Sequence, residues 1–188
     1  EQSRVSGLVS KTSNSINATA GQISEAEEQA LAYERKIKEQ EENISVLKAK
    51  LAEEIRMAQL AAQSSWRDIS EVSFAEGDRY LLANLIYCEA GGESYNGQVA
   101  VGAVVMNRVL SSVYPNTVTG VIYQSGQFSP VASGRLALAL AEGKATAGCY
   151  KAADEVMKGA TNVGNCVYFR TPVDGITPKY RIGGHIFY

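Results

Sequence analysis

The chain has 188 residues, of which 45% are hydrophobic and 20% charged, with a formal net charge of −2. This length suits one globular domain with an accessory element, and the charge predicts neither nucleic acid nor an anionic membrane as a partner. No apolar run reaches the roughly 20 residues of a transmembrane helix. Because no signal-peptide pattern follows Glu1, we expect a processed form or a piece of a longer protein.

The first third of the chain repeats apolar residues every seven positions, which predicts a helical coiled coil over residues 1–65. Ser, Thr and Asn, with Gly7 and Gly21, weaken the helix prediction in the first twenty residues. Such a helix is about 90 Å long and its apolar stripe requires a partner, either a second copy or another protein. A solvated spacer helix is the alternative. The main seam consists of Val9, Ile16, Ile23, Ala30, Ile37, Ile44, Leu51 and Ala58. The companion seam is mixed and includes Gln40, Leu47, Glu54 and Ala61.

Residues 66–77 break the heptads and contain the only Trp, so we predict a linker there and a separate domain over residues 78–188. In this domain the patterns predict two strands around a Pro/Gly loop, with apolar cores at 167–169 and 182–188. Helices followed by a terminal hairpin make an α+β domain. The predicted helices are 78–90 with Asp78 as N-cap, about 94–110, 118–123, 135–142 and about 147–158. The helix over 94–110 is apolar nearly all round and is expected to be central.

Glu89 interrupts the apolar helix that ends in the sequence LIYCEAGGES. It lies four residues after Leu85, on the face that this leucine buries, and at the negative end of the helix dipole. Both effects raise the pKa of a carboxyl group, which suits a general acid near neutral pH. The alternative is a buried structural carboxylate paired with a core arginine such as Arg108.

Cysteine chemistry is a second possibility. Cys88 could act as a thiol nucleophile with His185, the only histidine, as base. A helix C-terminus disfavours a thiolate, and Cys88 points about 100° away from Glu89, so a buried thiol is the simpler interpretation. Cys88, Cys149 and Cys166 show no paired CxxC spacing, so we expect no metal site and no cofactor. Whether Cys149 and Cys166 form a disulfide stays open.

Two further segments suggest a polar and aromatic cleft. Gln127, Phe128 and Ser129 lie in a predicted loop, where amides and rings suit sugar recognition. His185 in the closing strand could hydrogen-bond a substrate or orient the fold.

The segments LIYCEAGGESYNGQVAVGAVVMNRV, YPNTVTGVIYQSGQFSPV, VYFRTP and IGGHIFY together resemble the SleB/CwlJ-type cell-wall hydrolases, which include spore cortex-lytic enzymes. The resemblance implies a lysozyme-like catalytic domain with Glu89 as its acid. It also implies that Gly126 to Ser129 and Ile182 to His185 lie near a substrate groove, and we add Tyr168 and Phe169 as candidate binding residues. This chain has Gly91 where many members carry Arg, and lacks a Trp before the last strand. The heptad region is similar to the coiled coils of secreted PcsB/CwlO-type hydrolases.

The resemblance implies an extracytoplasmic enzyme that cleaves peptidoglycan between N-acetylmuramic acid and N-acetylglucosamine. A single acid, Glu89, favours a lytic transglycosylase, in which the muramic C6 hydroxyl attacks. A hydrolytic muramidase needs a second acid, for which Glu93 is the nearest candidate, although Glu93 could equally serve the first turn of the next helix. A Cys/His peptidase, or a non-catalytic scaffold that binds glycan, is the remaining alternative. The coil could recruit a division or sporulation protein.

Overall fold

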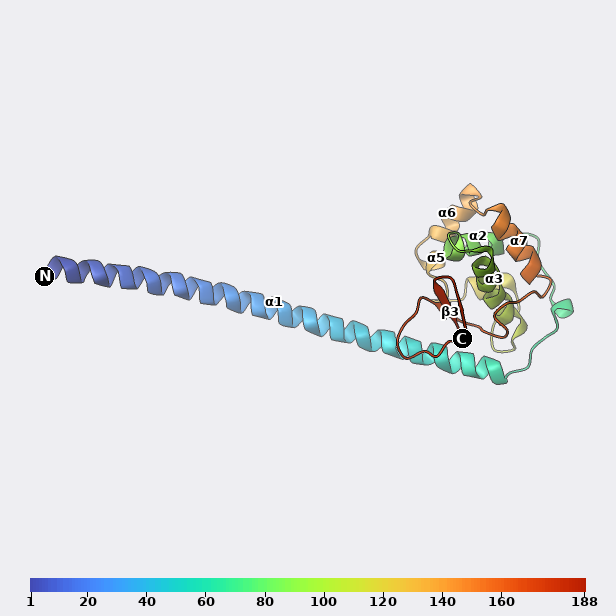
Figure 1. Cartoon of the computed structure of the whole chain (residues 1–188), viewed down its shortest axis with the longest axis horizontal. Helices are drawn as coiled ribbons and strands as arrows, with labels where there is room; N and C mark the ends of the chain where they lie inside the picture. Colours follow the sequence, from blue (N-terminus) through green and yellow to red (C-terminus); the bar gives the residue numbers. More distant parts are fainter. The chain divides into compact units, whose positions relative to one another are not determined.

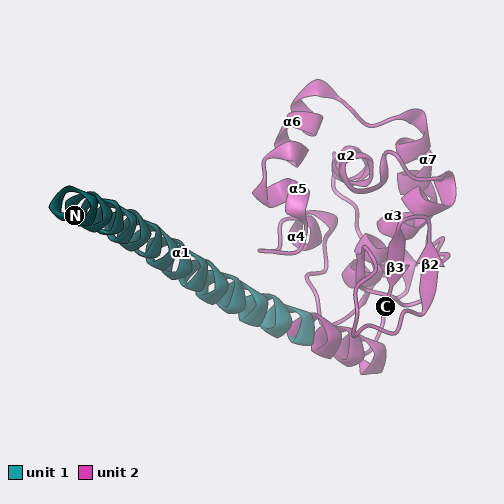
Figure 2. Ribbon diagram, turned by 60° about the vertical axis from the view of Figure 1, so that its left-hand side comes forward, with its two compact units in different colours: residues 1–52 teal, residues 53–188 magenta.

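Helices form most of this computed structural model, which describes residues 1–188. The chain divides into two units, residues 1–52 and residues 53–188, which are coloured separately in Figure 2. The elements, several of which Figure 1 labels, are α1 (Gln2–Gln63), the 3-10 helix η1 (Ile69–Glu71), α2 (Asp78–Ala90), α3 (Tyr95–Leu110), α4 (Val118–Ile122), α5 (Ser129–Ala132), α6 (Arg135–Glu142), α7 (Ala147–Val156), β1 (Phe169–Arg170), β2 (Tyr180–Ile182) and β3 (His185–Phe187).

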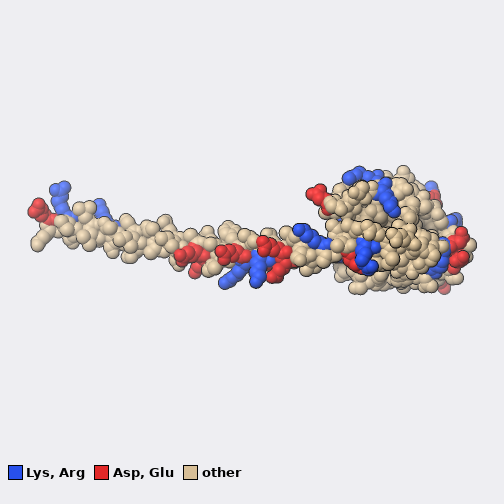
Figure 3. Space-filling view, turned by 90° about the horizontal axis from the view of Figure 1, so that it is seen from below, with Lys and Arg blue, Asp and Glu red and all other residues tan.

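The first unit consists of helix α1 up to Ala52, and every residue as far as Lys50 is exposed. The hydroxyls of Thr12 and Thr19 donate to carbonyls four residues earlier, at 3.0 and 2.9 Å, so the helix itself satisfies polar side chains in the segment where we predicted it weakly. The isoleucines of the main seam are each at least 50% exposed. Residues 12–24 carry no charge. Figure 3 shows an uncharged stretch of the helix near its free end, and charged side chains that gather further along it. No helix is both long and apolar enough to cross a membrane.

The second unit begins within α1, at Glu53. Ala61 is fully buried, and Met57 and Ala58 pack against the core from the preceding turn. Residues 66–77, predicted as a linker, lie along this unit, where Trp66 donates its indole N–H to the carbonyl of Ala61 at 3.1 Å. The last turns of the heptad helix therefore belong to the core of the second unit.

Helix α3 lies at the centre of the second unit, as its apolar sequence predicts. All residues from Gly97 to Val109 are buried, and α3 packs against α2, α4 and α7. Gly102 allows α2 and α7 to approach α3 closely, because a Cβ atom at this position would lie 3.0 Å from Ile86 Cδ1 and 3.2 Å from a Val156 methyl. This packing fixes the C-terminal end of α2, where Glu89 lies.

The limits of α2 are confirmed, but Asp78 is not its N-cap. Gly77, with φ of 95°, takes that position, and Asp78 is the first residue of the helix. The buried carboxylate of Asp78 accepts the backbone N–H of Ala75 at 2.8 Å and the hydroxyl of Thr119 at 3.3 Å. Asp78 thus joins α2 to α4 and to the preceding loop.

The C-terminal sheet has three antiparallel strands in the order β1-β3-β2, so the prediction of a two-stranded hairpin is wrong. The predicted strand over 182–188 turns back on itself at Gly183, whose φ of 57° favours glycine, and pairs with β2. In β1, Phe169 faces Phe187 of β3. A further helical turn, α5, occupies the segment expected to be a loop, with Pro130 near its start.

Candidate active site

One pocket of about 280 Å³ brings together residues that are far apart in the sequence. Seven of the eight predicted site residues line it, and only Glu93 does not. The lining residues are Glu54, Glu89, Arg108, Gln127, Phe128, Ser129, Tyr168, Phe169, Arg170, Thr171 and His185. They come from the end of α1, from α2 and α3, from the segment around α5, and from the sheet.

Glu89 reaches the pocket from the last turn of α2, where its side chain is partly buried. Desolvation by burial raises its pKa, and the positive charge of Arg135 on α6 opposes this shift. The carboxyl group makes no hydrogen bond and no ion pair. An unpaired carboxyl with a raised pKa, facing a cavity, can hold and donate a proton near neutral pH.

Arg108 does not pair with Glu89, so the alternative of a core ion pair is wrong. The guanidinium of Arg108 is 2% exposed, and its Nε donates to the carbonyl of Val167 at 2.6 Å. It lies over the rings of Tyr168 and Phe128, at 4.7 and 5.2 Å from their centroids. Burial lowers the pKa of Arg108. Arg108 therefore holds the rings of Tyr168 and Phe128, which line the pocket. In the sequence, Arg108 stands out as the only charged residue of helix α3.

The aromatic residues form one connected wall. The ring of Phe169 contacts that of His185 edge-on at 5.4 Å between centroids, and that of Phe128 at 6.4 Å. His185 Nδ1 is buried without a hydrogen bond. Rings of this kind offer faces on which sugar rings can stack, while the amide of Gln127 and the hydroxyl of Ser129 offer hydrogen bonds.

Glu93 lies outside the pocket and binds the turn between β2 and β3. Its two carboxylate oxygens share the backbone N–H of Gly184 at 3.2 and 3.3 Å, and Oε1 lies 3.8 Å from His185 Nδ1. A Cβ atom at Gly183 would lie 1.9 Å from Glu93 Oε2, so the turn closes tightly around this carboxylate. Ser94, rather than Glu93, caps α3 by accepting the N–H of Gly97.

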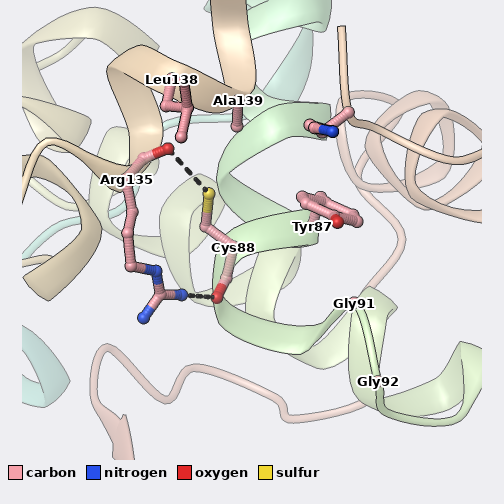
Figure 4. A pocket seen from close by; sticks show the side chains of 8 residues that line it. Tyr87, Cys88, Gly91, Gly92, Arg135, Leu138 and Ala139 are labelled. Atoms are coloured by element: carbon pink, nitrogen blue, oxygen red, sulfur yellow. Dashed lines mark hydrogen bonds between the residues drawn. The ribbon is translucent and has the colours of Figure 1, made fainter. Parts of the chain in front are cut away.

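Cys88 faces a different cavity, of about 550 Å³, which Figure 4 shows from close by. Its thiol donates to the carbonyl of Arg135 at 3.8 Å, and the Arg135 guanidinium donates back to the Cys88 carbonyl. Burial raises the pKa of the thiol. No histidine lines this cavity, and His185 lies in the other one. All three cysteines are free thiols.

The comparisons with known proteins agree on one family. The sequence pattern of the cell wall hydrolase family matches residues 92–188, which begin three residues after Glu89. A spore cortex-lytic enzyme of Bacillus cereus is 41% identical over 122 residues, which are 61% of this chain and 45% of that protein. The spore cortex-lytic enzyme of Bacillus subtilis is 36% identical over 121 residues, 61% of this chain and 38% of that protein. The chain thus spans less than half the length of these relatives.

Solved structures give the same result. The catalytic domain of the Bacillus cereus SleB protein has a TM-score of 0.52 and 38% identity, and the similarity covers 61% of this chain and 91% of that one. The catalytic domain of the germination-specific lytic transglycosylase SleB from Bacillus anthracis has a TM-score of 0.52 and 37% identity, with 61% and 96% covered. The second unit is therefore similar in fold to these catalytic domains.

Proposed function

The chain belongs to the cell wall hydrolase family, and on that premise we propose that it cleaves the glycan strands of peptidoglycan at the β-1,4 bond between N-acetylmuramic acid and N-acetylglucosamine. The similar Bacillus proteins are named as cortex-lytic enzymes and, in one case, as a lytic transglycosylase. The observation that carries the proposal is the unpaired Glu89 carboxyl, whose pKa burial raises, in a pocket lined by rings, an amide and a hydroxyl.

In the proposed mechanism, protonated Glu89 donates its proton to the glycosidic oxygen as positive charge develops on the sugar ring. The resulting carboxylate then accepts a proton from the nucleophile. If the nucleophile is the C6 hydroxyl of the muramic residue, the product is a 1,6-anhydro sugar. If it is water, the enzyme is a muramidase.

We favour the transglycosylase, because protein groups already bind both nearby carboxylates, and a carboxylate that is held by a cation or by hydrogen bonds is a weaker base for water. Glu93 is bound to the turn at Gly184. Glu54 lines the pocket, but Arg170 and the hydroxyl of Tyr188 bind one oxygen of its carboxylate, which stabilises the charged form and makes it a poor base. A peptidase that uses Cys88 and His185 is disfavoured, because these residues line separate cavities.

Product analysis tests the proposal. Mass spectrometry of digested peptidoglycan should detect 1,6-anhydromuramyl ends; reducing muramic ends would indicate a muramidase, and new peptide termini a peptidase. We expect Glu89→Gln to reduce glycan cleavage at least about a thousandfold while leaving the fold intact. Glu76→Gln is the matched control, because Glu76 is an exposed glutamate outside the pocket. Cleavage by the Glu89 variant at the rate of the control would refute the assignment.

The exposed seam of the first unit supports a second proposal, that residues 1–52 form a coiled coil with another helix. Such a partner would recruit the enzyme to the cell wall, outside the cytoplasm, where peptidoglycan is found. Sedimentation analysis of the full chain, compared with an Ile23→Ser/Ile37→Ser variant, tests whether the partner is a second copy. A wild-type chain that sediments as a monomer would exclude a second copy as the partner.

A further inference from the structure

Glu54 is the residue through which helix α1 lines the pocket of Glu89. It lies seven residues before the fully buried Ala61 and therefore on the same face of the helix. Its side chain is 21% exposed. Because Glu54 precedes the residues that match the family, membership of the family assigns it no role.

The two oxygens of the Glu54 carboxylate have different surroundings. Oε2 accepts the hydroxyl hydrogen of Tyr188 at 2.9 Å and pairs with Nη1 of Arg170 at 3.3 Å. Burial, together with the nearby Glu54 charge, raises the pKa of Tyr188, so the phenol stays protonated as a donor. Oε1 accepts no hydrogen bond from the protein. One oxygen is therefore anchored, while the other is free to accept.

The partners of Glu54 also belong to the wall of the pocket. Arg170 follows Phe169 in β1 and itself lines the cavity. Tyr188 stacks on Tyr168 with ring centroids 5.6 Å apart. Glu54 thus connects the aromatic wall to α1 and fixes the direction of its own carboxylate. A carboxylate held in this way binds a hydroxyl or amide without losing much side-chain entropy at that moment.

We infer that Glu54 is a substrate-binding residue of this pocket, whose Oε1 accepts a hydrogen bond from a sugar hydroxyl or acetamido N–H of the glycan. The inference rests on the proposed function, because it names a contact to the same substrate. It assigns Glu54 to binding rather than to proton transfer, which remains with Glu89. The end of the long helix is then part of the substrate site.

Kinetics of the full chain separate binding from chemistry. The substrate is a soluble tetrasaccharide of alternating N-acetylglucosamine and N-acetylmuramic acid. Glu54→Gln should raise KM about tenfold, because the amide replaces a charge-assisted contact, while kcat stays within about threefold. Glu53→Gln is the matched control: it is the neighbouring glutamate, 57% exposed, paired with Arg56 and outside the pocket. A lower kcat with unchanged KM, or a KM equal to that of the control, would overturn the inference.

Direct binding distinguishes a failure of this inference from a failure of the proposed function. The tetrasaccharide is titrated by calorimetry into Glu89→Gln, and into the same variant with Glu54→Gln added. The added substitution should weaken binding about tenfold, with thermal unfolding confirming that both proteins are folded at the temperature used. If Glu89→Gln binds the glycan and the second substitution changes nothing, the role of Glu54 is refuted. If neither the wild type nor Glu89→Gln binds glycan at all, the proposed function itself fails.

Discussion

Glu93 offers a sharp test of whether one carboxyl or two perform the reaction. If Glu93 were a second acid, Glu93→Gln would abolish cleavage and leave the fold unchanged. If it anchors the turn between β2 and β3, as its bonds to Gly184 indicate, the glutamine variant keeps an acceptor for that N–H and retains most activity. Glu93→Ala removes the acceptor and destabilises the turn beside His185.

The geometry of the Glu93 contact sets the size of the stability loss expected for Glu93→Ala. A hydrogen bond to a charged acceptor contributes about 1.5–3 kcal/mol, and here one N–H is shared between two oxygens on a side chain that is 25% exposed. We therefore expect Glu93→Ala to lower the free energy of unfolding by about 1–2 kcal/mol, and Tm by about 3–8 °C for a unit of this size. Glu93→Gln should cost less than about 1 kcal/mol.

Gly183→Ala provides an independent measure of the same contact. Its Cβ atom would lie 1.9 Å from Glu93 Oε2, and its φ of 57° adds about 1–2 kcal/mol for any L-residue. In the Glu93→Ala background the clash disappears, so the two substitutions should be less than additive in thermal unfolding. The reasoning is refuted if Glu93→Gln is as inactive as Glu89→Gln while its Tm equals that of the wild type.

Three further outcomes are expected. Arg135 lowers the pKa of Glu89, so Arg135→Ala should shift the alkaline limb of the pH–rate profile to higher pH, and Arg135→Lys should shift it less. Burial raises the pKa of Glu89 in the folded protein above its value of about 4.3 in the unfolded chain. The contribution of Glu89 to folding stability is therefore fully present below that pH, and it is lost as the pH rises through the folded pKa, because the buried carboxyl must then ionise. Glu89→Gln should therefore melt above the wild type at pH 7 and with it near pH 3.5; an equal difference at both pH values would contradict this. A chain that begins at Trp66 lacks the helical turn with the buried Ala61. Its free energy of unfolding in denaturant should therefore be lower, by more than about 2 kcal/mol, than that of a chain that begins at Glu53. Equal unfolding midpoints would show that this turn is dispensable.

Local patterns allowed much of the pocket to be predicted. Glu89 stood out as a carboxylate on an apolar face, and helical spacing alone separates it from Cys88, which lines another cavity. The segments around Phe128, Phe169 and His185 were predicted from short motifs and from the resemblance they carry. The antiparallel pairing of β1 with β3 brings Phe169 and His185 together, and the motif order alone does not specify this pairing.

The residues that were missed owe their position to long-range packing. Glu54 and Arg170 are 116 residues apart in sequence, and no local pattern pairs them. Glu54 did carry a signal, since it is the acidic residue on the companion seam, one heptad before Ala61, but we interpreted that seam as a coiled-coil interface. Strand β2 was missed because it has only three residues and two of them are exposed, so it shows little apolar alternation.

Helix α1 shows how one repeat can have two uses. The main seam keeps its seven-residue spacing from Val9 to Ala58. Its valine and isoleucines up to Ile44 are at least half exposed, whereas Ala58 packs against the core of the second unit. The residues of this seven-residue repeat therefore pack against other parts of the chain only in the last turns of α1. Burial of an isoleucine contributes about 1.5–3 kcal/mol, so the uncovered isoleucines of the first unit provide a substantial driving force for association. Because the continuous helix also carries Glu54 into the pocket, substitutions that change its pairing should be assayed for KM as well as for oligomeric state.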